Sequence, residues 1–129
     1  MGLSSGIMTP MDLSPVVEML RRFVAERDWA QFHDPKNLSM LLASEAGELL
    51  AEYRWVLNTE SDVHSRDPAA RARIEDEIGD VGMSLLLLCD RIGIDLAEAM
   101  RKKLLRNEDR YPVAASKGRS DRPVPGSAT

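Results

Sequence analysis

The chain has 129 residues and a formal net charge of −4, with 43% hydrophobic and 29% charged residues. A chain of this length forms one domain with a substantial hydrophobic core. Residues 112–129 carry a net charge of +2, so residues 1–111 carry −6, which argues against a nucleic acid partner. No apolar stretch approaches the 18 or more residues of a membrane span, so no membrane partner is expected.

The single cysteine, Cys89, has no second cysteine with which to form an internal disulfide. Residues 1–11 have neither the basic start nor the apolar run of a signal peptide. We therefore expect a reducing, cytoplasmic location. Residues 1–10 and 114–129 lack apolar periodicity, so they are expected to be flexible ends around a domain at 11–113.

Helix starts are marked by residues that favour the N-cap position. Ser14, Asp34 and Asp67 each precede a proline, which is favoured at the first helical position. Asp95, with Glu98 three residues later, resembles a reciprocal capping pair, and Gly93 is suited to end the preceding helix. The pattern predicts helices over 15–27, 35–57, 68–92 and 95–109 and no strand.

Apolar residues recur at helical spacing in each predicted segment, which indicates an all-α four-helix bundle. The stripes expected to face the interior are Val16, Val17, Leu20, Phe23 and Val24 in the first helix and Leu96, Ala99, Met100 and Leu104 in the last.

Two acidic pairs lie within the apolar stripes of the second and third predicted helices. The members of each pair, Glu45 and Glu48 in one and Glu77 and Asp80 in the other, are three residues apart and therefore share a helix face. Burying ionised carboxylates among leucines is costly unless a cation compensates. Oxygen ligands favour Mg²⁺, with Mn²⁺ as a substitute, over zinc. Glu52 extends the first acidic face by one turn and is a weaker candidate.

The acidic pairs are also compatible with roles that need no magnesium. A single pair of this spacing is common on a solvated helix face, and two pairs can also form salt bridges between helices. A di-iron bundle needs a glutamate three residues before a histidine, but Ala30 and Ser61 occupy the positions before His33 and His64. Gly47 and Gly79, one inside each pair, suggest either close helix packing or close approach of a ligand.

Four sequence blocks together resemble the all-α nucleoside triphosphate pyrophosphatases of the MazG-like group, particularly the dCTP pyrophosphatase branch. They occur in the family's order over roughly residues 18–122: FVAERDWAQFHDPKN at 23–37, SEAGELLAEYRW at 44–55, EDEIGDV at 75–81 and KLLRNEDRYPV at 103–113.

The resemblance implies a four-helix enzyme that hydrolyses a nucleoside triphosphate between the α and β phosphates, with dCTP or a modified dCTP as the leading substrate. It implies that Mg²⁺ is held by the carboxylates of Glu45, Glu48, Glu77 and Asp80, with Glu48 as the expected general base. The role of such an enzyme in the cell would be to remove unwanted nucleotides from the nucleotide pool.

The resemblance also implies residues that bind the nucleotide. Lys103, Asn107 and Arg110 share a helix face and would bind phosphate, followed by Tyr111. The alternative for the two cations is a solvated basic helix end that interacts with the helix dipole. His33 and Trp55 would contact the base, although capping and core packing are alternatives for these two. Trp29, Phe32 and Tyr53 are assigned mainly to packing, with a place at the border of the base pocket as the alternative for Trp29 or Phe32.

Two departures from the branch concern specificity and assembly. Ser84 stands where the branch commonly has tyrosine, and Arg122-Pro123 stands where it usually has Lys-Tyr. Since family members build the pocket from more than one chain, a homodimer or homotetramer is expected. The competing hypothesis is a helical oligomerisation or nucleotide-binding module without catalytic activity.

Overall fold

The computed structural model describes residues 12–121, and within that range every regular element is helical. The expected all-α class is therefore confirmed. No helix in this range is long and apolar enough to cross a membrane. The predicted flexible segment 1–10 and the Arg122-Pro123 pair lie outside the described residues. The chain divides after Gly93 into two compact units, each of which is described by itself.

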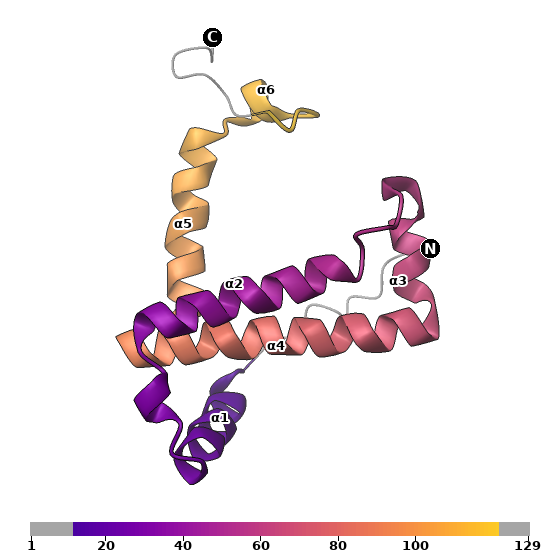
Figure 1. Ribbon diagram of the computed structural model, residues 1–129. Coiled ribbons are helices and arrows are strands. Elements are labelled where there is room, and N and C mark those ends of the chain that lie inside the picture. Colours follow the sequence, from indigo (N-terminus) through magenta and orange to yellow (C-terminus); the bar gives the residue numbers. More distant parts are fainter. Residues whose placement is uncertain (1–11, 122–129) are drawn as a thin grey trace. The chain divides into compact units, whose positions relative to one another are not determined.

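The first unit contains four α-helices and two short 3₁₀ helices (Figure 1). They are α1 (Ser14–Glu26), η2 (Ala30–Phe32), α2 (Pro35–Ala51), η3 (Asn58–Glu60), α3 (Ser61–Arg66) and α4 (Pro68–Ile92). The second unit contains α5 (Leu96–Arg110) and the four-residue α6 (Val113–Ser116), which the sequence did not predict.

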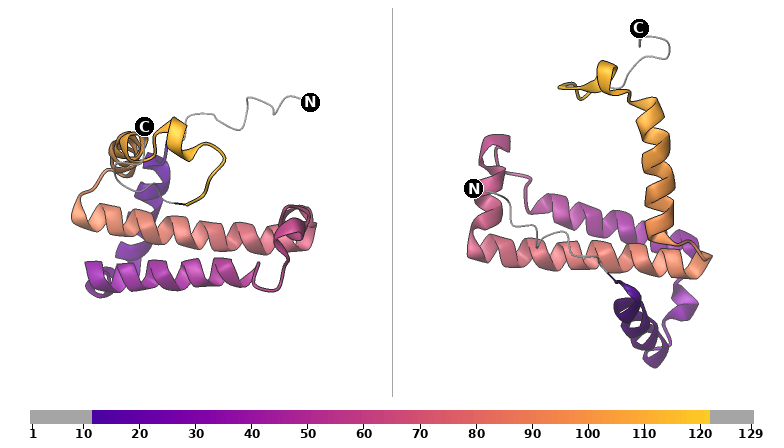
Figure 2. Two further views of the ribbon diagram at one scale, coloured as in Figure 1. Left: turned by 90° about the horizontal axis from the view of Figure 1, so that it is seen from above. Right: turned by 180° about the vertical axis from the view of Figure 1, so that it is seen from behind.

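The antiparallel pair of α2 and α4 is the centre of the first unit. These two helices lie side by side in the views of Figures 1 and 2, and α3 joins the end of α2 to the start of α4. Leu38 of α2 is 1% exposed, and Ala70 and Ile74 of α4 are also buried. The helix pair therefore provides the packed framework from which the acidic side chains project.

The first helix, α1, packs against α4 and is tied to it by an ion pair. Arg21 Nε donates to Asp90 Oδ2 at 3.1 Å, and Val24 is buried beside this link. The hydrogen bond from Arg21 lowers the pKa of Asp90 below its usual value. Because these side chains are substantially exposed, the pair fixes the orientation of α1 more than it stabilises the fold.

Three of the four predicted N-caps are confirmed. Asp34 accepts a hydrogen bond from the backbone N–H of Asn37, Asp67 from that of Ala70, and Asp95 from that of Glu98. The predicted reciprocal bond is absent at Asp95, because the Glu98 carboxylate instead binds Arg101 at 2.7 Å. Gly93 ends α4 in the left-handed conformation with φ 70°, as expected.

The fourth predicted cap, at Ser14, is wrong. Ser14 is the first residue of α1, and its backbone N–H donates to the carboxylate of Asp12 at 3.0 Å. The acid two residues upstream thus takes the role that the sequence suggested for the serine.

The second predicted helix is six residues too long, because α2 ends at Ala51. Contacts with α3 compete with continued helix: His64 Nε2 is 3.0 Å from the backbone carbonyl oxygen of Glu52, and the hydroxyls of Tyr53 and Ser65 are 2.7 Å apart. These contacts join residues that are 12 positions apart, so helix periodicity does not report them.

The predicted interior stripes are only partly buried. In α1, Val24 is buried, but Val16 and Phe23 are 39% and 43% exposed because they line a cavity described below. In α5, Met100 and Leu104 are exposed, since no other helix of the second unit covers this face within the described residues.

Candidate active site

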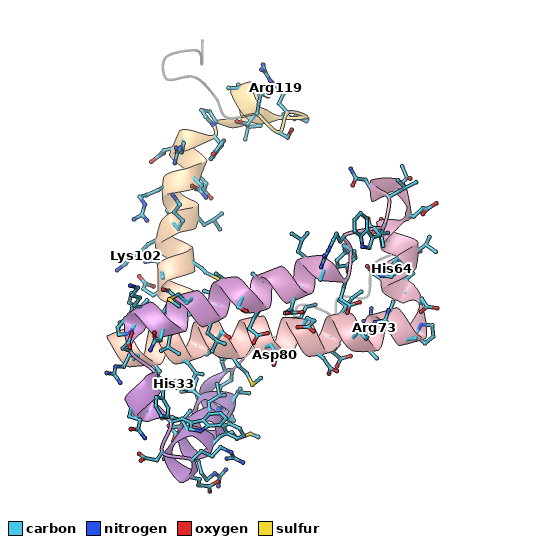
Figure 3. The ribbon with its side chains drawn as sticks, in the orientation of Figure 1. His33, His64, Arg73, Asp80, Lys102 and Arg119 are labelled. Atoms are coloured by element: carbon cyan, nitrogen blue, oxygen red, sulfur yellow. The ribbon has the colours of Figure 1, made fainter. Side chains whose placement is uncertain are left out.

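Three of the four predicted metal ligands come together between α2 and α4. One carboxylate oxygen from each of Glu45, Glu77 and Asp80 lies within 4.8 Å of the other two, and all three side chains are half-buried. Figure 3 labels Asp80 near the middle of α4. We call Glu45, Glu77 and Asp80 the acidic cluster. Antiparallel packing produces it, because acids three residues apart on each helix face the other helix.

Glu48, the fourth predicted ligand and predicted base, is not part of this group of three. It lies one turn after Glu45 on α2 and is exposed, yet it is close enough for its charge to act on Glu77. Glu52 lies one turn further along and pairs with Arg73 of α4, with Glu52 Oε2 and Arg73 Nε 3.1 Å apart. The acidic face therefore ends in an ion pair.

The pKa of Glu77 is raised above its usual value. Partial burial is the main cause, followed by the negative charges of Asp80, Glu48, Glu45 and Glu52. Within the described residues, no cation lies within 4.0 Å of any carboxylate of the acidic cluster or of Glu48. The uncompensated charge of this donor set is suited to a hard divalent cation such as Mg²⁺ or Mn²⁺.

The two glycines inside the acidic pairs are not required for helix packing. A Cβ atom built on Gly47 or Gly79 would meet no atom within 4 Å. Of the two roles that the sequence suggested, close packing against another helix of the described residues is therefore not supported, and close approach of a ligand remains a prediction.

We expect Glu77→Gln to stabilise the metal-free protein at neutral pH. Because the folded state raises the pKa of Glu77, its ionisation favours unfolding as the pH rises through that pKa, and the amide removes this effect. Below the usual pKa of 4.5, where the carboxyl is protonated in both states, the two proteins should differ little. Thermal unfolding in chelator at acid and neutral pH measures the difference.

With Mg²⁺ added, we expect the wild type to become more stable than Glu77→Gln. A cation that binds only the folded wild type stabilises it by about 2.7 kcal/mol at one hundred times its Kd, whereas Glu77→Gln lacks one ligand. Equal stabilisation of both proteins by Mg²⁺ would contradict a role for Glu77 in the centre.

A cavity of about 380 Å³ adjoins the acidic cluster. Its walls come from α1, the segment before α2, and the facing sides of α2 and α4, and Glu45 and Asp80 form part of its edge. The lining is otherwise mostly apolar: Val16, Met19, Leu20, Phe23, Val24, Trp29, His33, Leu41, Met83, Ser84 and Leu87. An apolar cavity next to converging acidic side chains has the composition of a small-molecule binding site.

The predicted base-binding residues are placed differently from one another. His33 lines the cavity, and Trp29 lines it too, with its ring packed edge-on to Phe23 at 5.6 Å. Trp55 does not line it: it is 88% exposed in the turn after α2. Phe32 is 59% exposed and lies outside the lining as well.

The predicted phosphate-binding residues belong to the second unit. Asn107 is half-buried on α5, and its backbone carbonyl accepts from the N–H of Tyr111 at 2.8 Å. Lys103 and Arg110 are exposed, and the Arg110 guanidinium lies 5.9 Å from the ring of Tyr111. Lys103 lies in the middle of α5 and Arg110 is its last residue, and both side chains carry a positive charge that can bind an anion.

Sequence reasoning missed the contribution of α1 to the cavity. Met19 and Leu20 line it together with Met83 of α4, whereas the sequence pattern placed only Leu20 in an apolar stripe. Ser84 is 3% exposed and its hydroxyl donates to the backbone carbonyl of Asp80 at 2.7 Å. Ser84 is thus a small, hydrogen-bonded side chain in the wall of the cavity.

Known proteins show the same sequence pattern and helical fold. The chain is 41% identical over 108 residues to dCTP pyrophosphatase 1 of Mus musculus, covering 81% of this chain and 64% of that protein. It is 38% identical over 110 residues to dCTP pyrophosphatase 1 of Homo sapiens, covering 82% and 65%. The chain therefore spans just under two thirds of the length of these relatives.

The crystal structure of a pyrophosphatase from Archaeoglobus fulgidus matches with a TM-score of 0.71 and 34% identity. The match covers 81% of this chain and 95% of that one. Residues 41–122 match the MazG-like family, and this segment includes the whole acidic cluster. Since the match extends over more than half of the chain, the protein belongs to the MazG-like family.

Proposed function

We propose that the protein hydrolyses a nucleoside triphosphate between the α and β phosphates, giving the monophosphate and pyrophosphate. The observation that carries this proposal is the acidic cluster of Glu45, Glu77 and Asp80 beside an apolar cavity. The similarity of the chain to dCTP pyrophosphatases supports the proposed reaction and the proposed substrate. The proposed substrate is dCTP or a modified dCTP, and the proposed role is cleansing of the nucleotide pool in the cytoplasm.

The proposed ligands of Mg²⁺, or of Mn²⁺ in its place, are Glu45, Glu77 and Asp80, with Glu48 as the fourth. Their carboxylate oxygens and unpaired charge support a hard divalent cation. A bound divalent cation would neutralise phosphate charge and favour ionisation of water.

Glu48 is the proposed general base. It is exposed beside the cluster, so it can accept the proton of a water whose oxygen attacks the α phosphorus. The bond from the α phosphorus to the bridging oxygen then breaks, and pyrophosphate leaves with that oxygen.

The cavity is the proposed base site. Trp29 and His33 in its wall can stack on a base and form a hydrogen bond to it, respectively. The space beside Ser84, among apolar neighbours, suits a pyrimidine with a substituent on its ring. Lys103, Asn107, Arg110 and Tyr111 are the proposed phosphate contacts from the second unit.

We further propose a homodimer or homotetramer. Large apolar side chains of the first unit, including Trp55 at 88% and Leu50 at 67%, are exposed, which is unfavourable for an isolated chain. Association would cover such side chains, and we propose that Trp55 of one copy then contacts a nucleotide held by another.

The alternative of a non-catalytic helical module has less support. It requires the acidic pairs to form salt bridges between helices, but only Glu52 does so among the acids of this face in the described chain. An acidic cluster without cationic partners is costly for a purely structural module.

The reaction is tested by separating the products formed from a panel of canonical and 5-modified nucleoside triphosphates, with Mg²⁺, with Mn²⁺ and with chelator. Monophosphate and pyrophosphate in equal amounts, formed only with metal, support the proposal, and the panel ranks the bases. Release of inorganic phosphate with a nucleoside diphosphate would identify a different bond, and no turnover by folded protein would refute the enzyme.

A further inference from the structure

We propose that Arg73 binds the two phosphates that leave as pyrophosphate, exchanging its bond to Glu52 for bonds to phosphate oxygens. The inference rests on the proposed function, because it takes the acidic cluster as the place where the α phosphorus is attacked. It adds a phosphate-binding residue in the first unit, from a part of α4 that the sequence analysis did not assign to the site.

The first argument is the order of groups along α4. Arg73 is seven residues before Asp80, which is two helical turns or about 10 Å along the axis. Figure 3 labels both residues on this helix. The cavity lies on the other side of the cluster, since Met83 and Ser84 line it. Cavity, acidic cluster and Arg73 therefore follow one another along a single face of α4.

This order matches the order of groups in a nucleoside triphosphate. With the base in the cavity and the α phosphate at the cluster, the β and γ phosphates must extend away from the base. Among the described residues of α4, Arg73 is the cation that lies on this face in that direction. The antiparallel register supports the placement, because the contact of Glu52 with Arg73 sets Glu48 level with Glu77 and Glu45 level with Asp80.

The second argument is the bonding capacity of the guanidinium group. It has five N–H donors, and in the described structure Arg73 uses only Nε, in the bond to Glu52. Its terminal nitrogens remain available for the two-point contact that arginine makes with phosphate. The Arg73 side chain is 55% exposed, so solvent weakens the bond to Glu52 and a multiply charged phosphate can compete for it.

The third argument is that the partner of Arg73 is held in place. The backbone carbonyl of Glu52 contacts His64 Nε2 at 3.0 Å, and the Glu52 side chain is only 20% exposed. When the bond breaks, the flexible arginine is therefore the side that moves. In the absence of a nucleotide, the bond to Glu52 keeps Arg73 at the edge of the acidic face. A bound di- or triphosphate would replace Glu52 as the partner of Arg73.

The test is the affinity for inorganic pyrophosphate in the presence of MgCl₂, measured by calorimetry. Loss of charged hydrogen bonds should weaken binding by about 10-fold to 100-fold in Arg73→Met, with dCMP binding unchanged. The matched control is Arg71→Met, which removes the same charge from the opposite face of α4 and should leave pyrophosphate binding unchanged. Glu52→Gln should bind pyrophosphate at least as tightly as wild type, because Arg73 is released.

Equal weakening in Glu52→Gln and Arg73→Met would overturn the proposal, because it would mean that the ion pair only supports the helices. Unchanged affinity in Arg73→Met, or no pyrophosphate binding by wild type, would overturn it as well. Thermal unfolding of each variant separates loss of folding from loss of binding. If wild type hydrolyses no nucleotide but binds pyrophosphate through Arg73, the catalytic proposal fails, and only the assignment of Arg73 as a pyrophosphate-binding residue stands.

Discussion

Asp80→Asn should reduce nucleotide hydrolysis by more than about 100-fold while leaving the helices folded. Substituting a residue that only orients a metal ligand commonly lowers metal affinity or activity 10-fold to 100-fold. Asp80 is itself a proposed ligand in the acidic cluster, so its loss should cost more. The amide keeps the shape of the side chain but removes its charge, so Mg²⁺ affinity should fall as well. Steady-state kinetics over a range of Mg²⁺ concentrations measures both effects.

The matched control for this substitution is Glu75→Gln, which removes one charge from the exposed opposite face of α4. It should retain the activity of the wild type. A similar loss in both variants would indicate that net charge, and not the cluster, supports activity. Full activity in Asp80→Asn would contradict the proposed metal centre, and a large loss of thermal stability would favour a structural role for the acids.

Leu38→Ala should destabilise the protein by about 2 to 5 kcal/mol, because truncating a buried leucine leaves a cavity that the surroundings fill only partly. Leu38 is the largest side chain that is less than 2% exposed among the described residues. Since domains of this size are stable by only about 5 to 15 kcal/mol, much of the stability would be lost. Urea unfolding should show a lower midpoint.

Leu50→Ala is the control for this prediction, since Leu50 lies on the same helix but is 67% exposed. Its unfolding midpoint should change little in dilute protein. If Leu50→Ala destabilises the protein as much as Leu38→Ala, the exposed side chain is covered by a second copy, and the loss should then depend on protein concentration.

Local signals were sufficient to predict the framework of the site. The caps at Asp34 and Asp67 are contained within four residues of chain, and they fix where α2 and α4 begin. The acids three residues apart then predict which face meets the other helix. For Glu45, Glu77 and Asp80 this prediction is confirmed by their proximity.

Features that depend on distant parts of the chain could not be predicted in the same way. Periodicity shows that Val16 and Phe23 share an apolar face, but not that this face borders a cavity instead of a filled core. The bond between Glu52 and Arg73 joins residues 21 positions apart. It depends on where α2 ends, and contacts with α3 determine that end.

The antiparallel register of α2 and α4 determines where the chain tolerates changes of length. One residue inserted between Glu77 and Asp80 would turn the rest of α4 by about 100° relative to the part before it, so that Arg73 and Ile74 would no longer share their faces with the residues after the insertion. One residue inserted near Asn58, in the connection between the two helices, would leave both acidic pairs intact and disturb only local contacts around α3. Insertions and deletions should therefore accumulate in that connection among working variants and be excluded from the helix interiors.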